Sequence, residues 1–222
     1  MRCTLSSMSH PSKLDRAAIV AAGMALLARD GLHGLSLRAI AAALDVAPNA
    51  LYHHVKDRKD LERMLAAEVS QLLHSALRRK INGATQSAQD AVLVMVTEYM
   101  RFAREHRLLY EALLVPRPPA GGVDTVEPEQ LWLFVLGIVT AVSGKAAAHE
   151  ATVALWAFLH GMASLQSVNA FNDEKPLSSL EFGLQAWMQA AQAARLAEEG
   201  GARGKTKVAG RRLAGGRGRS RP

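Results

Sequence analysis

Residues 35–61 read LSLRAIAAALDVAPNALYHHVKDRKDL and contain two short helical patterns, 36–44 and 48–55, joined by a tight turn. In each pattern the apolar residues recur at the spacing of one helical face. Asp45 lies at the turn and tolerates the left-handed backbone that such a turn requires. Ala41 is small enough for the two helices to cross closely. The stretch therefore predicts a helix-turn-helix.

Helical patterns continue on both sides of this stretch. A helix over 13–29, with Ser12 as its N-cap, is predicted to stop at Gly31, and another helix is predicted over 57–80. No segment shows the period-two alternation of a half-buried strand, so the fold class is all-α. We expect a three-helix N-terminal head on a C-terminal helical bundle. The later helices are predicted over residues 86–105, 107–115, 128–142, 147–169 and 178–198.

The net charge of +7 is unevenly distributed along the 222 residues. Residues 1–80 contain 12 basic and 7 acidic side chains, residues 81–199 contain 7 and 13, and residues 200–222 contain 8 and none. Basic ends around an acidic middle indicate a polyanionic partner for the ends. The last segment, rich in glycine and arginine, is predicted to be disordered and to add non-specific, salt-sensitive affinity for DNA.

Cysteine usage and apolar runs limit the class of protein. The single cysteine, Cys3, excludes an internal disulfide framework and a cysteine-rich zinc module. The first residues contain no apolar run typical of a secretory signal. The longest apolar run, 131–142, has 12 residues, whereas a membrane span needs about 20. We expect a soluble, cytoplasmic protein without a membrane partner.

The segment LYHHVKDRKDL (51–61), preceded by a helix that ends in RDGLHG, resembles the signature of the TetR family of transcriptional regulators. The resemblance implies a homodimeric, ligand-responsive repressor that binds a palindromic operator in double-stranded DNA. It implies a DNA-binding domain over 1–56, an effector-binding and dimerisation domain over 57–199, and a basic tail over 200–222. Helices 147–169 and 178–198 would pair across the two-fold axis as a four-helix bundle. No cofactor and no metal are expected.

The resemblance also implies roles for residues of the head. Asn49 is expected to form directional hydrogen bonds with a base, and Ala50 to contact a thymine methyl group. Arg58, near a helix start that favours anions, is expected to bind phosphate. Two residues depart from the family pattern: Asp45 replaces the usual turn glycine, and Ala47 replaces a capping side chain. The full set of expected DNA contacts is Arg38, Pro48, Asn49, Ala50, Tyr52, His53, His54, Lys56, Arg58 and Lys59.

A small-molecule effector is expected in the C-terminal helices. At positions where the tetracycline-binding members have a metal-binding histidine and a ligand-binding asparagine, this chain has Leu113 and Met95. A magnesium chelate of tetracycline would therefore lack polar anchors, and we expect an apolar effector that needs no metal. The candidate ligand-binding residues are His74, Met95, Tyr99, Phe102, Leu113 and Trp132.

Two other classes of protein are alternatives to the regulator. An architectural protein that binds DNA without reading its sequence would use the basic head and tail alone. An all-α enzyme would need convergent catalytic groups, and the sequence offers no paired carboxylates, Cys–His set or glycine-rich phosphate loop. His53 and His54 are adjacent and face differently on a helix, which disfavours a metal pair. His149 and His160 share a helical face and are expected at an interface.

Overall fold

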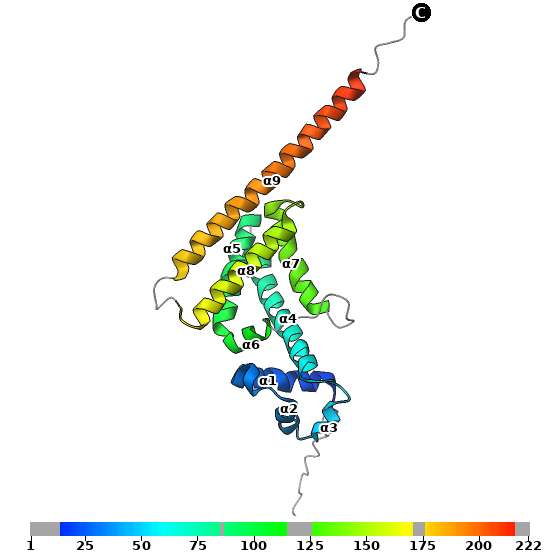
Figure 1. Cartoon of the computed structure of the whole chain (residues 1–222), viewed down its shortest axis with the longest axis vertical. Helices are drawn as coiled ribbons and strands as arrows, with labels where there is room; N and C mark the ends of the chain where they lie inside the picture. The colour runs from blue at the N-terminus through cyan, green and yellow to red at the C-terminus, as the bar shows by residue number, and fades with distance from the viewer. Residues whose placement is uncertain (1–13, 85–86, 115–125, 171–175, 216–222) are drawn as a thin grey trace, which may run out of the picture. The chain divides into compact units, whose positions relative to one another are not determined.

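The computed structural model describes residues 14–84, 87–114, 126–170 and 176–215. All regular elements in these ranges are helices, which confirms the predicted all-α fold (Figure 1). The described residues form two compact units, one containing 14–69 and 108–114 and the other containing the rest. The division after Val69 falls inside a helix, 13 residues beyond the predicted domain boundary at Lys56.

The first unit contains the predicted head. Its α1 is capped by Asp15, whose carboxylate accepts a hydrogen bond from the Ala18 N–H at 2.8 Å. The predicted stop at Gly31 is a kink with φ 67°, after which the chain turns helically to Gly34. Its elements are α1 (Arg16–Gly34), α2 (Leu37–Ala43), α3 (Pro48–Leu51), the first part of α4 (Arg58–Ala84), and most of α6 (Arg107–Ala112).

The corner between α2 and α3 has the predicted backbone. Ser36 caps α2 by accepting a hydrogen bond from the Ala39 N–H at 3.1 Å. Asp45 adopts a left-handed conformation with φ 53°, which permits the sharp reversal. Ala47 precedes α3 and provides no side-chain cap, so the start of α3 relies on the preset φ of Pro48.

The core of the first unit is built where α1, α2 and α4 meet. Ile40, Leu51 and Leu65 are completely buried. Gly23 of α1 lies at the closest approach, where a methyl group would stand 2.9 Å from Cδ2 of Leu65. Burial of each such leucine or isoleucine contributes about 1.5–3 kcal/mol, which holds the short α2 and α3 in place.

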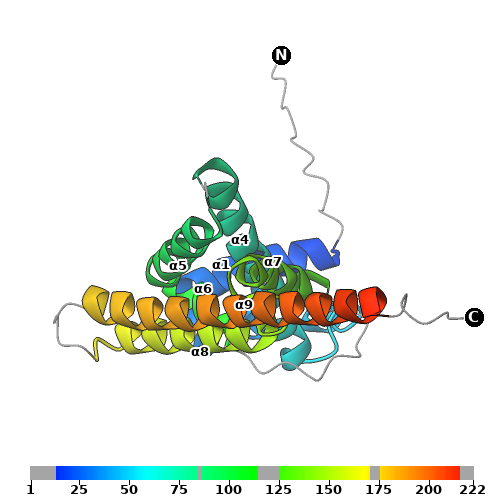
Figure 2. The same cartoon turned by 90° about the horizontal axis from the view of Figure 1, so that it is seen from above.

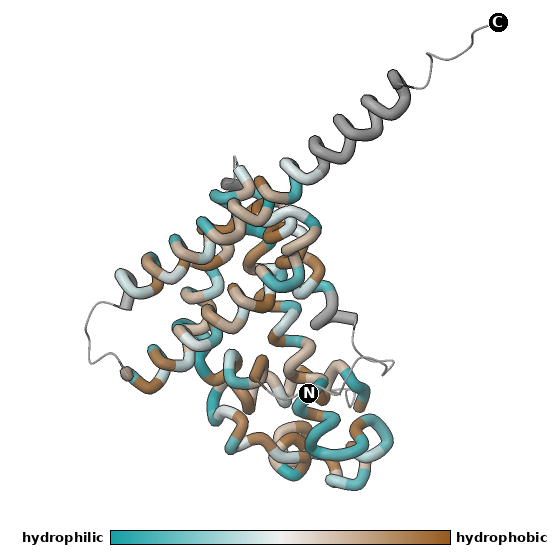
Figure 3. The backbone as a smooth tube through the Cα atoms, turned by 45° about the horizontal axis from the view of Figure 1, so that its top comes forward, coloured by the Kyte–Doolittle hydropathy of each residue, from teal (hydrophilic) through white to brown (hydrophobic). Residues whose placement is uncertain are grey.

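The second unit consists of the rest of α4, α5 (Ala88–Glu105), α7 (Val126–Ser143), α8 (Ala148–Ser167) and α9 (Pro176–Gly215). Ser87 caps α5 by accepting a hydrogen bond from the Asp90 N–H at 3.1 Å. α8 and α9 lie side by side along much of their length (Figure 2). Hydrophobic and polar residues are interspersed along both helices (Figure 3). Each helix buries one face, which includes Leu155 in α8 and Leu184 in α9, and leaves other apolar side chains such as Phe182 exposed.

The crossing of α8 and α9 depends on a missing side chain. Gly183 of α9 faces Phe158 of α8, and a methyl group at Gly183 would overlap the phenyl ring. Nearby, the indole Nε1 of Trp187 donates a hydrogen bond to the Ala151 carbonyl at 2.9 Å. A ring seated over a glycine and a cross-helix hydrogen bond together keep these helices in close contact.

Several helix ends differ from the prediction: α1 begins at Arg16 with Asp15 as its N-cap, not at residue 13 with Ser12, and the largest differences are at α3 and α9. α3 ends at Leu51 instead of Val55, and α9 continues to Gly215, although disorder was predicted from Gly200. Each residue added to an existing helix contributes a backbone hydrogen bond, and in α9 this acts against the low helix propensity of the glycines. Ser12, Cys3 and residues 216–222 lie outside the described residues.

Within the described residues, no single helix is long and apolar enough to span a membrane. Gln130–Ser143 and Ala148–Ser167 reach that length and composition only as a pair, and the pair is bent by 114°.

A carboxylate is buried in the second unit. Glu98 of α5 is only 4% exposed, and both of its oxygens accept hydrogen bonds from the Arg101 guanidinium, at 2.9 and 2.5 Å. The hydrogen bond from Arg101 holds the pKa of Glu98 below its ordinary value, against the opposing effect of burial, with Arg79 and Lys80 adding attraction. Ionised Glu98 therefore stabilises the folded chain.

We predict that Glu98→Gln lowers the free energy of unfolding at pH 7 by about 1–3 kcal/mol. The folded pKa lies below the unfolded value, so the stabilisation is present above about pH 5 and disappears as pH falls through the folded pKa. Urea unfolding at fixed protein concentration, between pH 7 and pH 3, should show the two proteins converging at low pH. A difference that is absent at pH 7, or independent of pH, would contradict this assignment.

Candidate DNA-binding surface and effector site

The segment predicted to read DNA lies on the surface of the first unit. Pro48 and Asn49 are exposed, and Tyr52 is 57% exposed, so its ring is available to a partner. Ala50 and His54 are half-buried. The remaining candidates flank α3 and are all exposed: Arg38, His53, Lys56, Arg58 and Lys59.

The recognition helix is shorter than predicted. Regular α3 ends at Leu51, and Tyr52, His53 and His54 follow in a turn. The turn is held by hydrogen bonds to the Leu51 carbonyl from the N–H groups of His54 and Val55, each at 2.9 Å. Aromatic, histidine and valine residues have modest helix propensity, and without a capping side chain the helix does not extend.

The start of α4 is ordered by two aspartates. Asp57 accepts a hydrogen bond from the Asp60 N–H at 2.8 Å, and Asp60 accepts one from the Lys56 N–H at 3.0 Å. Asp60 also forms an ion pair with Arg63 at 3.0 Å. These bonds satisfy the N–H groups of Asp60 and Lys56, so these two backbone donors are unavailable to a phosphate.

Arg58 is engaged within the unit. Its Nη2 donates to the Leu32 carbonyl at 3.0 Å, and its Nε donates to Glu62 at 2.8 Å. The guanidinium thus ties the start of α4 to the end of α1, and Glu62 offsets its charge. Arg58 is also exposed and has further N–H donors, so its expected contact with phosphate remains a prediction. Among the described residues, the side chains of Lys56 and Lys59 form no ion pair and are exposed.

The six candidate ligand-binding residues are divided between the two units. Leu113 is buried in the first unit, whereas the other five belong to the second. Met95, Tyr99 and Phe102 are buried on α5, and Trp132 is half-buried on α7. The Phe102 ring lies beside that of His106, with centroids 4.9 Å apart.

A chain of aromatic rings joins α5, α7 and α8. The Tyr99 hydroxyl and Nδ1 of His160 are hydrogen-bonded at 2.8 Å. The Trp156 ring packs edge-on against Tyr99, Trp132 and His160, with centroids 6.2, 6.3 and 5.4 Å apart. Trp132 in turn packs against His149 at 5.7 Å. We call Tyr99, Trp132, His149, Trp156 and His160 the ring cluster.

Sequence reasoning missed part of this cluster. Trp156 was not singled out, and the packing of His149 and His160 against rings of other helices was not predicted. Trp156 and His160 are four residues apart on α8, a spacing that places them on one face. That spacing was the available signal. Among the described residues, no three histidine, cysteine or carboxylate side chains are grouped to hold a metal.

His74 lies apart from the ring cluster. Its ring packs edge-on against Phe134 of α7, with centroids 5.0 Å apart. Burial, with repulsion from Arg78, lowers the pKa of His74. The imidazole is therefore held neutral at physiological pH, so that it could accept a hydrogen bond from a ligand.

Comparison with known proteins agrees with both units. Residues 19–62 match the family model of bacterial regulatory proteins of the tetR family, and residues 92–187 match a tetracyclin repressor-like C-terminal domain. An uncharacterized HTH-type transcriptional regulator of Mycobacterium tuberculosis is 30% identical over 174 residues, covering 76% of this chain and 78% of the relative. The class D tetracycline repressor protein of Escherichia coli is 28% identical over 118 residues, 53% of each chain.

Solved structures show the same fold. A protein of unknown function from Rhodococcus has a TM-score of 0.67 and 23% identity, covering 83% of this chain and 97% of its own. A TetR variant from Acinetobacter baumannii in complex with minocycline has a TM-score of 0.61 and 20% identity, covering 82% and 99%. From its two matched domains and its relatives, the chain belongs to the TetR family and is a DNA-binding transcriptional regulator, not an enzyme.

Proposed function

We propose that this regulator is a homodimeric repressor that releases a palindromic operator when a small apolar effector binds. The observation that carries the proposal is the exposure of Asn49 and Tyr52 on a rigid helix-turn-helix in a TetR-family chain. Two such heads related by a two-fold axis would read two half-sites of opposite orientation.

Within each head, different side chains serve different purposes. Asn49 reads a base edge, with adenine the best partner for its amide, and Ala50 contacts a thymine methyl group. Lys56 and Lys59, exposed and without ion pairs among the described residues, contact phosphates. The remaining contacts, from Arg38, Pro48, Tyr52, His53 and His54, position the head on the DNA backbone and groove edge. Arg58 acts chiefly to link the start of α4 to the end of α1 through its hydrogen bond to the Leu32 carbonyl.

The operator can be identified by selecting bound fragments from genomic DNA, followed by gel-shift competition. Asn49→Ala should cost about 1–3 kcal/mol of binding and relax specificity at one position in each half-site. Lys59→Ala should weaken binding to all sequences and make it less dependent on salt. Equal retention of random DNA in the gel-shift competition would instead favour an architectural DNA-binding protein.

Arg58→Ala should lower thermal stability, since it leaves the Leu32 carbonyl without this donor.

The dimer interface is proposed on the outer faces of α8 and α9. Phe182 of α9 is 76% exposed, and Val168, directly after α8, is 69% exposed. Small exposed residues lie between such side chains and would let two copies approach closely. They include Ala154, Ala157, Gly161, Ala186, Ala190 and Ala193. An apolar surface of this kind on two adjacent helices is typical of a four-helix dimer bundle.

We expect light scattering to show a dimer at micromolar concentration, and Phe182→Glu to convert it to a monomer because each interface would bury unpaired charge. Leu93→Glu, at another exposed apolar position on α5, is the matched control and should remain dimeric. If the unmodified protein is a monomer, or both variants behave alike, α8 and α9 do not form the interface.

The effector is proposed to bind at the ring cluster. Trp132, Trp156 and His160 are half-buried, so a ligand could reach them, and their rings offer apolar faces with hydrogen-bonding edges. Tyr99 and His160 would orient the ligand through the polar pair that they form. The effector need not chelate a metal, since Met95 is not a metal ligand of the kind that hard cations prefer.

Trp156→Ala should abolish the response to any ring-bearing compound that releases the operator, while Leu133→Ala, exposed on α7, should preserve it. Titration followed by tryptophan fluorescence measures binding, and gel shift measures release. Calorimetry should detect no tight binding of tetracycline with magnesium. Magnesium-dependent tight binding, or an unchanged response in Trp156→Ala, would contradict the proposed effector site.

A further inference from the structure

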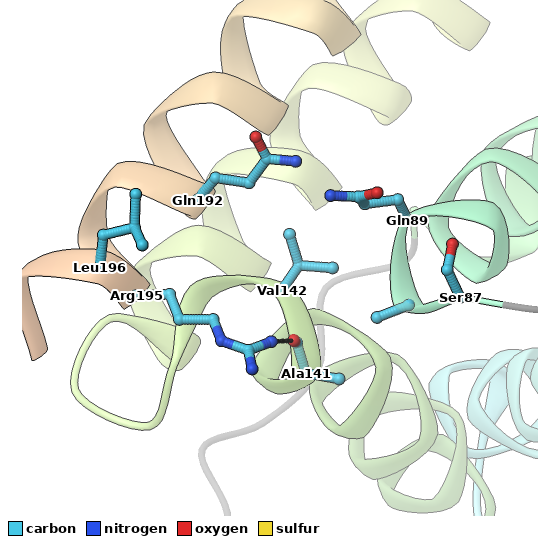
Figure 4. Close-up of a pocket in the computed structure, with 8 residues that line it drawn as sticks. Ser87, Gln89, Ala141, Val142, Gln192, Arg195 and Leu196 are labelled. Carbon is cyan, nitrogen blue, oxygen red and sulfur yellow. Dashed lines mark hydrogen bonds between the residues drawn. The ribbon is translucent and has the colours of Figure 1, made fainter. Parts of the chain in front are cut away.

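A cavity of about 410 Å³ lies in the second unit, and no residue of the ring cluster lines it (Figure 4). Three elements form its wall: the start of α5, the end of α7 and the middle of α9. The volume is within the range of roughly 300–1,000 Å³ that is common for small-molecule sites. The lining residues are Ser87, Ala88, Gln89, Ala141, Val142, Gln192, Arg195 and Leu196.

The cavity wall combines one cation, two amides and an apolar floor. The side-chain amides of Gln89 and Gln192 extend toward one another above Val142, and Arg195 lies on the near side (Figure 4). Ser87 adds little hydrogen-bonding capacity, because its hydroxyl both donates to Asp90 Oδ2 at 2.8 Å and accepts from the Asp90 N–H. Binding specificity therefore rests on the guanidinium and the two amides.

The Arg195 guanidinium is held in place by hydrogen bonds that use only some of its N–H donors. Its Nη1 donates to the Ala141 carbonyl at 2.5 Å, and its Nε donates to Glu199 at 3.0 Å. A guanidinium has five N–H groups, so Nη2 and one proton of Nη1 are not used by these two bonds. The hydrogen bond to Ala141 fixes the guanidinium at the end of α7, which lowers the entropic cost of binding an anion there.

We propose that this cavity is a second ligand site, selective for small organic carboxylates that carry an amide group and a short apolar chain, as N-acyl amino acids do. The carboxylate pairs with the Arg195 guanidinium. The ligand amide, a donor and an acceptor, bonds with Gln89 and Gln192. The acyl chain covers Val142 and Leu196. Glu199 competes with the carboxylate for Arg195, so it limits affinity.

Calorimetry on the full-length protein tests the proposal with three probes: N-hexanoylglycine, its uncharged primary amide, and hexanoate. We expect N-hexanoylglycine to bind most tightly, because only it offers both the carboxylate and the amide. Arg195→Gln should weaken its binding about tenfold or more, through loss of a charge-assisted hydrogen bond. Arg104→Gln, at an exposed arginine on α5, is the matched control and should bind as the unmodified protein does.

Glu199→Gln provides a second test of ligand binding at Arg195 if Arg195→Gln proves unstable. It removes the competing carboxylate and retains Arg195, so the affinity for N-hexanoylglycine should increase several-fold. Trp156→Ala should leave this binding unchanged, which separates the cavity from the ring cluster. The proposal is overturned if N-hexanoylglycine does not bind at millimolar concentration, if its uncharged amide binds equally well, or if Glu199→Gln weakens binding.

Discussion

The head of this regulator depends on anchoring a helix that cannot stand alone. α3 has four residues, far fewer than an isolated helix needs in water, and it lacks a side-chain cap. Leu51 and Val55, both buried, attach its inner side to the core that Ile40 and Leu65 complete. Because that side is held by packing, Asn49 and Tyr52 can remain exposed without losing their orientation. Rigidity of the reading surface therefore comes from apolar burial beneath it.

Charge serves stability in some places and binding in others. Arg58 and Arg101 are both satisfied inside their own units, by Leu32 and Glu62 in one case and by Glu98 and a short ion pair with Glu105 in the other. Lys56 and Lys59 have no such partners among the described residues. A count of basic residues thus overstates how many cations are available to DNA.

Local chemistry made much of the fold predictable, and long-range contacts account for what was missed. Asp45 and the stop at Gly31 could be predicted because each follows from the backbone preference of a single residue. The tie from Arg58 to Leu32 spans 26 residues, and the bond from Tyr99 to His160 spans 61, so no local pattern indicates either. Leu113 was grouped with the effector candidates by resemblance alone, and its place in the other unit could not be inferred from spacing.

Gly183, which leaves room for the Phe158 ring where α8 and α9 cross, limits how these helices can move. Sliding α9 along its axis by about one turn would bring Leu180 or Trp187, which lie on the same helical face as Gly183, beneath the Phe158 ring, where a methyl group at Gly183 would already overlap. The crossing therefore has a single axial register. A conformational signal carried by α9 must be a tilt or a rotation about this point, not a translation, so its two ends would swing in opposite directions.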